Sequence, residues 1–116
     1  MDESTASDLL HDERAATLGR VQTLAGSLTD IVSNTDGANS DDEHDPEGST
    51  IAYERAQVAA LLADAQSYLS DLDRALVRLV DGSYSICEKC RRTIPAERLE
   101  ALPACRTCIE CAVVRH

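Results

Sequence analysis

The chain has 116 residues and a formal net charge of −10, and it contains neither Phe nor Trp. With only three Tyr it is poorly suited to a broad globular core, yet 43% of its residues are hydrophobic, mainly Ala, Leu and Val. Such residues suit the narrow seams between helices, and no stretch approaches the ~20 apolar residues of a membrane span. The composition therefore predicts one mainly α domain with no membrane contact.

Negative charge is concentrated in the N-terminal half of the chain. Residues 1–50 hold twelve acidic residues and two arginines, whereas residues 51–116 hold nine of each sign. Binding to nucleic acid requires Lys and Arg to replace phosphate counterions, so we expect no direct sequence-specific nucleic-acid binding. The charge fits a basic protein surface or a metal ion as partner, and the alternative is that it only keeps the chain in solution.

Residues 1–8 read MDESTASD, which is no secretory signal peptide. We expect this segment to be disordered and the protein to be cytoplasmic. In the cytoplasm, clustered cysteines are more often metal ligands than disulfides.

Two stripes of apolar residues, spaced alternately by three and four, predict two helices. A segment near 35–49, rich in Asp, Asn, Gly and Ser, cannot continue either helix. The first stripe is Leu18, Val21, Ala25, Leu28 and Val32, and the second is Val58, Leu62, Ala65, Leu69, Leu72, Leu76 and Leu79.

Running the stripes in opposite directions pairs Val32 with Val58 and continues, layer by layer, to Leu18 with Leu72. Residues 9–80 are therefore expected to form an antiparallel coiled-coil hairpin with an acidic tip loop near 35–49. Extending the same register places His11 and Arg14 on the seam. We expect the coiled coil to stop there, so that Leu76, Leu79 and Val80 meet the domain formed by residues 81–116 instead.

The second helix is expected to begin at a capping Ser49 or Thr50 and to end at Gly82.

Residues 81–116 follow as a small C-terminal four-cysteine zinc-finger domain. Cys87-Glu-Lys-Cys90 and Cys108-Ile-Glu-Cys111 are two C-x₂-C pairs separated by seventeen residues. Each pair can place two thiolates on one side of a tetrahedral ion, and the spacing is typical of four-cysteine zinc sites. We expect one structural Zn²⁺. A redox dithiol or an iron–sulfur site is the weaker alternative, because two pairs at this spacing close a four-ligand shell and leave no open position for chemistry.

Other residues near these pairs leave two questions open. Cys105 forms a further C-x₂-C with Cys108, so it is either a replacement ligand or a spare thiol. Four thiolates on Zn²⁺ carry a net charge of −2, which nearby basic side chains could offset unless they form an ordinary solvated surface. These side chains are Lys89, Arg91, Arg92 and Arg106.

Residues 81–111 resemble the zinc finger of the DksA/TraR family, and the preceding acidic-tipped hairpin resembles the other half of these proteins. The segments that carry the resemblance are Asp81-Gly82-Ser83-Tyr84-Ser85-Ile86-Cys87-Glu88-Lys89-Cys90, Ile94-Pro95, Arg98-Leu99-Glu100-Ala101, Pro103 and Cys108-Ile109-Glu110-Cys111.

The resemblance implies a monomeric bacterial transcription regulator, not an enzyme, that binds RNA polymerase and inserts its coiled-coil tip into the secondary channel. Members that act with ppGpp carry basic residues where this chain has Leu102 and Ala112, so alarmone dependence is not implied. The family commonly has Gly after the second cysteine, where a positive φ is needed; here Arg91 takes that place at a cost of ~1 kcal/mol.

The tip acids are the candidate partner-binding residues: Asp41, Asp42, Glu43, Asp45 and Glu47. Two other functions remain open. The tip carboxylates could hold a second Mg²⁺ and promote transcript cleavage, or the chain could be a zinc-stabilised interaction protein with a partner other than polymerase.

Overall fold

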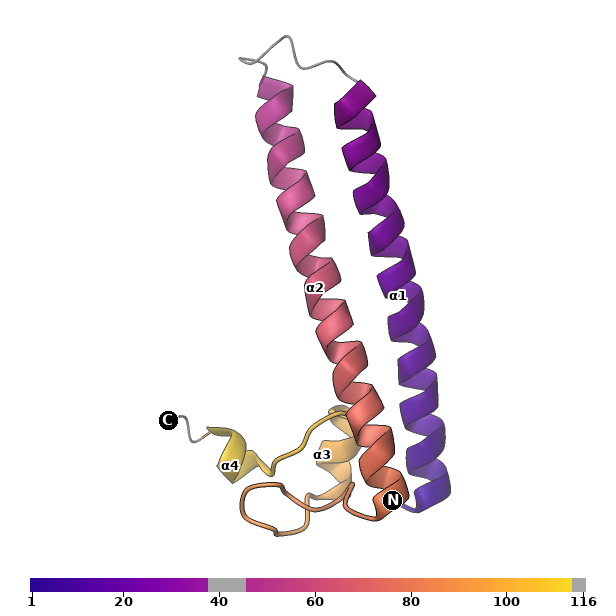
Figure 1. The fold of residues 1–116 in the computed structure, drawn as a ribbon. Helices are drawn as coiled ribbons and strands as arrows, with labels where there is room; N and C mark the ends of the chain where they lie inside the picture. Colours follow the sequence, from indigo (N-terminus) through magenta and orange to yellow (C-terminus); the bar gives the residue numbers. More distant parts are fainter. Residues whose placement is uncertain (38–45, 114–116) are drawn as a thin grey trace. The chain divides into compact units, whose positions relative to one another are not determined.

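The computed structural model describes residues 1–37 and 46–113, and within these ranges the chain is mainly helical (Figure 1). Two long helices, α1 (Glu3–Gly37) and α2 (Pro46–Asp81), are followed by two short ones, α3 (Ala96–Ala101) and α4 (Ile109–Val113). The described residues contain no β-strand, only a single antiparallel bridge between Ile86 and Thr93. None of the described helices is both long and apolar enough to cross a bilayer. The predicted mainly α hairpin with a C-terminal cysteine finger is confirmed.

Residues 1–16 and the chain from Tyr68 onward form one compact unit, and Thr17–Ser67 forms a second. This division differs from the boundary at residue 81 that the cysteine pattern suggests. The first unit includes the beginning of α1 and the end of α2 together with the finger, because all of these contribute to one apolar core. That core includes Ala6, Leu10, Leu72, Ala75, Tyr84, Cys87, Ile94, Leu99 and Cys108.

The N-terminus is ordered, contrary to the expectation that residues 1–8 lack structure. Helix α1 begins at Glu3, and the carboxylate of Asp2 accepts a hydrogen bond from the backbone N–H of Thr5 at 2.7 Å. This contact satisfies one of the free N–H groups of the first turn. One turn later Ala6 is buried, and Leu10 is completely buried. A cap and an apolar face therefore extend the helix past the point where the sequence pattern weakens.

The helix seam in the first unit also departs from the register expected from the sequence. Arg14 does not end the helix pairing, because its Nε lies 2.6 Å from Oδ1 of Asp73 on α2. Leu76 and Leu79 pack against the core of the first unit, which includes residues of the finger, whereas Val80 is 86% exposed and does not. The expectation for Val80 was wrong because a residue 100° round the helix from Leu79 turns away from the core.

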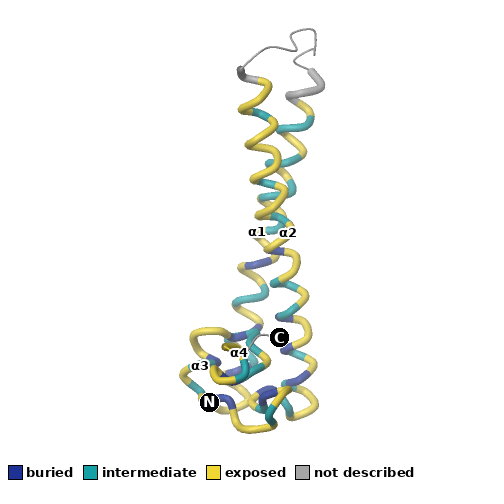
Figure 2. The backbone as a smooth tube through the Cα atoms, turned by 90° about the vertical axis from the view of Figure 1, so that its left-hand side faces the viewer, coloured by how far each residue is buried: buried dark blue, intermediate teal, exposed yellow. Residues whose placement is uncertain are grey.

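The second unit consists of the middle of α1 and the first part of α2, which run side by side in opposite directions (Figure 1). Its seam is thinly packed: Ala65 is buried, but most of the other seam residues are only half-buried (Figure 2). Thr17 is completely buried, whereas its neighbour Leu18, expected in the seam, is 36% exposed. Leu28 and Val32 share an open cavity of about 440 Å³ with Arg55 and three alanines, Ala52, Ala56 and Ala59.

Candidate metal centre

The end of α2 directs the chain toward the first cysteine pair. Gly82 has φ +86°, a left-handed conformation that glycine adopts without strain. The N–H of Ser83 donates to the carbonyl of Arg78 at 2.9 Å, and the N–H of Gly82 donates to the carbonyl of Leu79 at 3.4 Å. This is the usual pattern of a glycine-terminated helix, and it confirms the predicted stop at Gly82.

Tyr84 connects the segment before the first cysteine pair to the segment before the second. Its hydroxyl donates to the backbone carbonyl of Pro103 at 2.8 Å, and the residue is only 5% exposed. Burial raises the pKa of the Tyr84 phenol to about 12, because the phenolate would lose its hydration.

The first cysteine pair lies in a tight turn closed by backbone hydrogen bonds. The N–H of Cys87 donates to the carbonyl of Arg92 at 2.8 Å, and the N–H of Arg91 donates back to the carbonyl of Cys87 at 3.0 Å. To close this turn Arg91 adopts φ +66°, the only positive φ among the described residues other than glycine. The positive φ predicted at the position after the second cysteine is therefore confirmed.

The second cysteine pair lies at the beginning of α4. The N–H of Ala112 donates to the carbonyl of Cys108 at 3.0 Å, which holds Cys111 one turn beyond Cys108. The two turns are joined directly, because the N–H of Glu88 in the first donates to the carbonyl of Arg106 ahead of the second at 2.9 Å.

Together the turns bring four sulfur atoms into one cluster. The Sγ atoms of Cys87, Cys90, Cys108 and Cys111 all lie within 4.8 Å of one another. The Sγ atoms of Cys90 and Cys108 are 3.7 Å apart. A tetrahedral Zn²⁺ with Zn–S distances of ~2.3 Å requires S–S separations of about 3.8 Å, so the cluster fits a four-thiolate zinc ion. Cys87 and Cys108 are buried and the other two are half-buried, as befits a closed structural site.

The electrostatics of the cluster favour a bound cation. Backbone N–H groups, that of Cys90 above all, lower the pKa of the Cys87 thiol to about 6. The Cys108 sulfur, with burial and the other two thiols, raises the pKa of Cys111 to about 12. Four thiols this close cannot all ionise unless a cation shares their charge. A divalent ion would stabilise all four thiolates, and the four cysteines are placed to bind one metal ion, as the sequence predicts.

The basic residues proposed to offset the thiolate charge lie at the surface. Lys89, Arg91, Arg92 and Arg106 are all exposed. Arg92 is 3.5 Å from Glu110, with both side chains at least three-quarters exposed, so this ion pair contributes little to stability.

Two other arginines contact the finger more closely than these four, although the sequence did not point to them. Arg78 is only 8% exposed and donates through Nη2 to the carbonyl of Tyr84 at 3.1 Å. Arg98 on α3 donates through Nε to the carbonyl of Thr107 at 3.0 Å. Arg78 follows Ala75 by three positions on the buried face of α2, and that spacing is a signal that could have identified it.

Cys105 does not belong to the sulfur cluster. It is half-buried against the core of the first unit, and burial raises the pKa of its thiol, an effect that the nearby guanidinium groups of Arg98 and Arg78 oppose. Of the two readings of Cys105, the structure supports the spare thiol.

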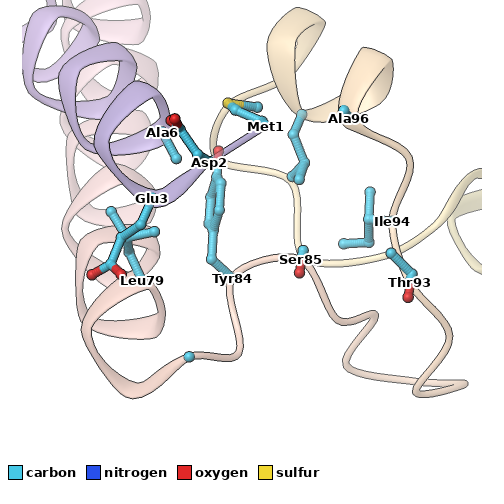
Figure 3. Close-up of a pocket in the computed structure, with 12 residues that line it drawn as sticks. Met1, Asp2, Glu3, Ala6, Leu79, Tyr84, Ser85, Thr93, Ile94 and Ala96 are labelled. Atoms are coloured by element: carbon cyan, nitrogen blue, oxygen red, sulfur yellow. The ribbon is translucent and has the colours of Figure 1, made fainter.

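A cavity of about 400 Å³ in the same unit lies apart from the cysteines (Figure 3). It is bounded by the beginning of α1, the end of α2 and the segments around Tyr84 and Ile94. Its walls are mixed: apolar side chains such as Leu79 and Ile94 line it together with four polar residues, which are Asp2, Glu3, Ser85 and Thr93. No ligand cysteine lines this cavity, so it is not part of the metal centre.

The candidate tip residues lie outside the part of the chain that the structure describes. This applies to Asp41, Asp42, Glu43 and Asp45 and to the side chain of Glu47. Helix α2 begins at Pro46, ahead of the expected caps Ser49 and Thr50, consistent with the preference of proline for the first helical position.

Comparison with known proteins supports the resemblance seen in the sequence. Residues 82–115 match the model of the prokaryotic DksA/TraR C4-type zinc finger. The structure of transcription factor DksA2 from Pseudomonas aeruginosa superposes with a TM-score of 0.79 and 26% identity, covering 95% of this chain and 79% of that one.

Two proteins of Bacillus subtilis (strain 168) are also similar. The uncharacterized protein YteA is 39% identical over 69 residues, which are 60% of this chain and 29% of YteA. General stress protein 16O is 34% identical over 73 residues, which are 63% of this chain and 45% of that protein. The matched region thus spans less than half the length of these curated relatives.

Proposed function

Because the chain combines a DksA/TraR-type C4 zinc finger with the fold of DksA2, we propose that it is a zinc-dependent transcription regulator that acts by binding RNA polymerase. The observation that carries the proposal is the structural match, which extends over 95% of this chain and so includes the hairpin as well as the finger. On this proposal the protein acts in the cytoplasm as a monomer, makes no sequence-specific contact with nucleic acid, and catalyses no reaction itself.

The two ends of the hairpin have different roles in this proposal. The finger, with the ends of α1 and α2 that pack on it, forms the surface that anchors the protein to polymerase. The tip acids from Asp41 to Glu47 enter the secondary channel and act electrostatically near the catalytic Mg²⁺. Carboxylates repel one another in free solution, and a nearby divalent cation reverses that cost.

The test is binding and transcription with purified bacterial core RNA polymerase. We expect the wild-type protein to bind polymerase and to change transcript yield from a set of promoters. The combined substitutions Asp42→Asn, Asp45→Asn and Glu47→Gln should leave binding nearly unchanged and abolish the change in yield. Cys108→Ser, which removes a metal ligand, should abolish binding.

The other outcomes point to different functions. Cleavage of the transcript in stalled complexes, lost in the triple variant, would identify a Mg²⁺-dependent cleavage factor instead of a regulator. Failure of the zinc-loaded wild-type protein to bind polymerase would overturn the proposal and leave an interaction protein with another partner. A triple variant that binds and regulates normally would refute the role of the acidic segment alone.

A further inference from the structure

Three cysteines in the second half of the finger are spaced so that two different C-x₂-C pairs overlap. Cys105 with Cys108 and Cys108 with Cys111 have the same spacing, and either pair could complete the zinc shell begun by Cys87 and Cys90. The structure uses Cys108 and Cys111. Some feature of the fold must therefore hold Cys105 away from the metal.

The backbone between Cys105 and Cys108 is held at every carbonyl. The carbonyl of Cys105 accepts a long hydrogen bond from Nη1 of Arg78 at 3.5 Å. The carbonyl of Arg106 accepts from the N–H of Glu88 at 2.9 Å. The carbonyl of Thr107 accepts from Nε of Arg98 at 3.0 Å. A rotation of this segment that brought the Cys105 sulfur to the metal would have to break these contacts.

Two of the three donors are arginine side chains, and Arg78 is itself well fixed. Arg78 has only 10% of its side chain exposed, and its other contacts are with the carbonyl of Tyr84 at 3.1 Å and with Glu88, whose Oε1 lies 3.9 Å from Nε. Its planar guanidinium thus bridges the segments that lead into both cysteine pairs. A lysine has one ammonium group at this position and cannot span both carbonyls in the same way.

We propose that Arg78 and Arg98 are positioning residues that select the zinc ligands, by holding residues 105–107 so that Cys111 and not Cys105 completes the shell. The proposal concerns the metal centre and does not depend on polymerase binding. It differs from an ordinary stabilising role in one respect: without the two arginines, Cys105 competes with Cys111 for the metal.

The first test maps the unprotected thiol in zinc-loaded protein with iodoacetamide, followed by peptide mass spectrometry. In wild-type protein the alkylated cysteine should be Cys105, with Cys111 protected. In Arg98→Met, and in Arg78→Met with Arg98→Met, label should appear on Cys111 as Cys105 becomes protected. Zinc affinity should fall by roughly 10- to 100-fold, as for other losses of contacts that orient metal ligands. Arg106→Met, at an exposed arginine in the same segment, is the matched control and should label as wild type does.

The second test separates ligand selection from a general loosening of the finger. Combined with Cys105→Ser, the arginine variants should again protect Cys111, because no competing thiol remains. Combined with Cys111→Ser, Arg98→Met should retain more zinc than Cys111→Ser alone, because Cys105 can then reach the ion. If Cys111 stays protected in the arginine variants, or is labelled equally with and without Cys105, the two arginines do not select the ligands and the proposal is wrong. The single variant Arg98→Met decides the question if the double variant does not fold.

Discussion

Replacement of Leu10 by alanine tests the packing of the first turns of α1 against α2 and the finger. Leu10 is completely buried in a core that includes Leu72 and Ala75 of α2. The change removes the equivalent of three methylene groups, each worth ~0.8 kcal/mol of transfer free energy, or about 2.4 kcal/mol in all. The cavity left behind adds to this, so we expect a loss of about 2 to 5 kcal/mol in the free energy of unfolding.

The assay is urea unfolding followed by circular dichroism, with zinc saturating in every sample so that metal loss does not contribute. The midpoint should fall while the slope of the transition stays the same. Leu18→Ala is the matched control, because Leu18 lies on the same helix but is 36% exposed, and it should cost less than about 1 kcal/mol. The register expected from the sequence makes the opposite prediction, since it places Leu18 in the seam and ends the seam before Leu10. Equal effects of the two substitutions, or a larger effect at Leu18, would refute the packing described for α1.

The remaining predictions concern the finger. Cys108→Ser should reduce bound zinc from one equivalent to less than half an equivalent, and it should unfold the finger because the metal supplies folding free energy. Cys105→Ser should keep its zinc. Metal analysis of the two variants after dialysis distinguishes these outcomes. The raised pKa of Tyr84, about 12 against an ordinary 10.0, means that the folded state favours the neutral phenol. Its contribution to stability is therefore complete below about pH 10 and is lost as the pH rises toward 12. Urea midpoints over that range should fall in wild-type protein and fall less in Tyr84→Phe, and parallel curves would contradict this cause. Arg91→Gly should raise the free energy of unfolding by up to about 1 kcal/mol, because glycine adopts the left-handed φ of +66° without the strain that a Cβ causes. A loss of stability would show that contacts of the Arg91 side chain matter more than this strain.

The parts of this protein that the sequence by itself determined are those governed by a few neighbouring residues. The helix stop at Gly82 and the positive φ at Arg91 are local, because each depends on one residue's backbone conformation and on hydrogen bonds within a few positions. The zinc centre is nearly as local, since the C-x₂-C spacing already places two thiolates on one side of an ion. The direction of the hairpin follows from two apolar stripes joined by a short polar segment.

Only the tertiary structure decided features that depend on residues far apart in the chain. A heptad stripe does not distinguish Thr17 from Leu18 at the seam, because small rotations of one helix about its axis exchange neighbouring residues at the contact. The burial of Leu10 requires the end of α2 to lie beside the beginning of α1, and nothing in residues 1–10 encodes that partner. The sequence pointed to Cys111 as the fourth ligand but left Cys105 open as a replacement. In the structure they differ because Arg78 and Arg98 reach the carbonyls of residues 105 and 107 from two other helices, and a spacing pattern contains no information about such contacts.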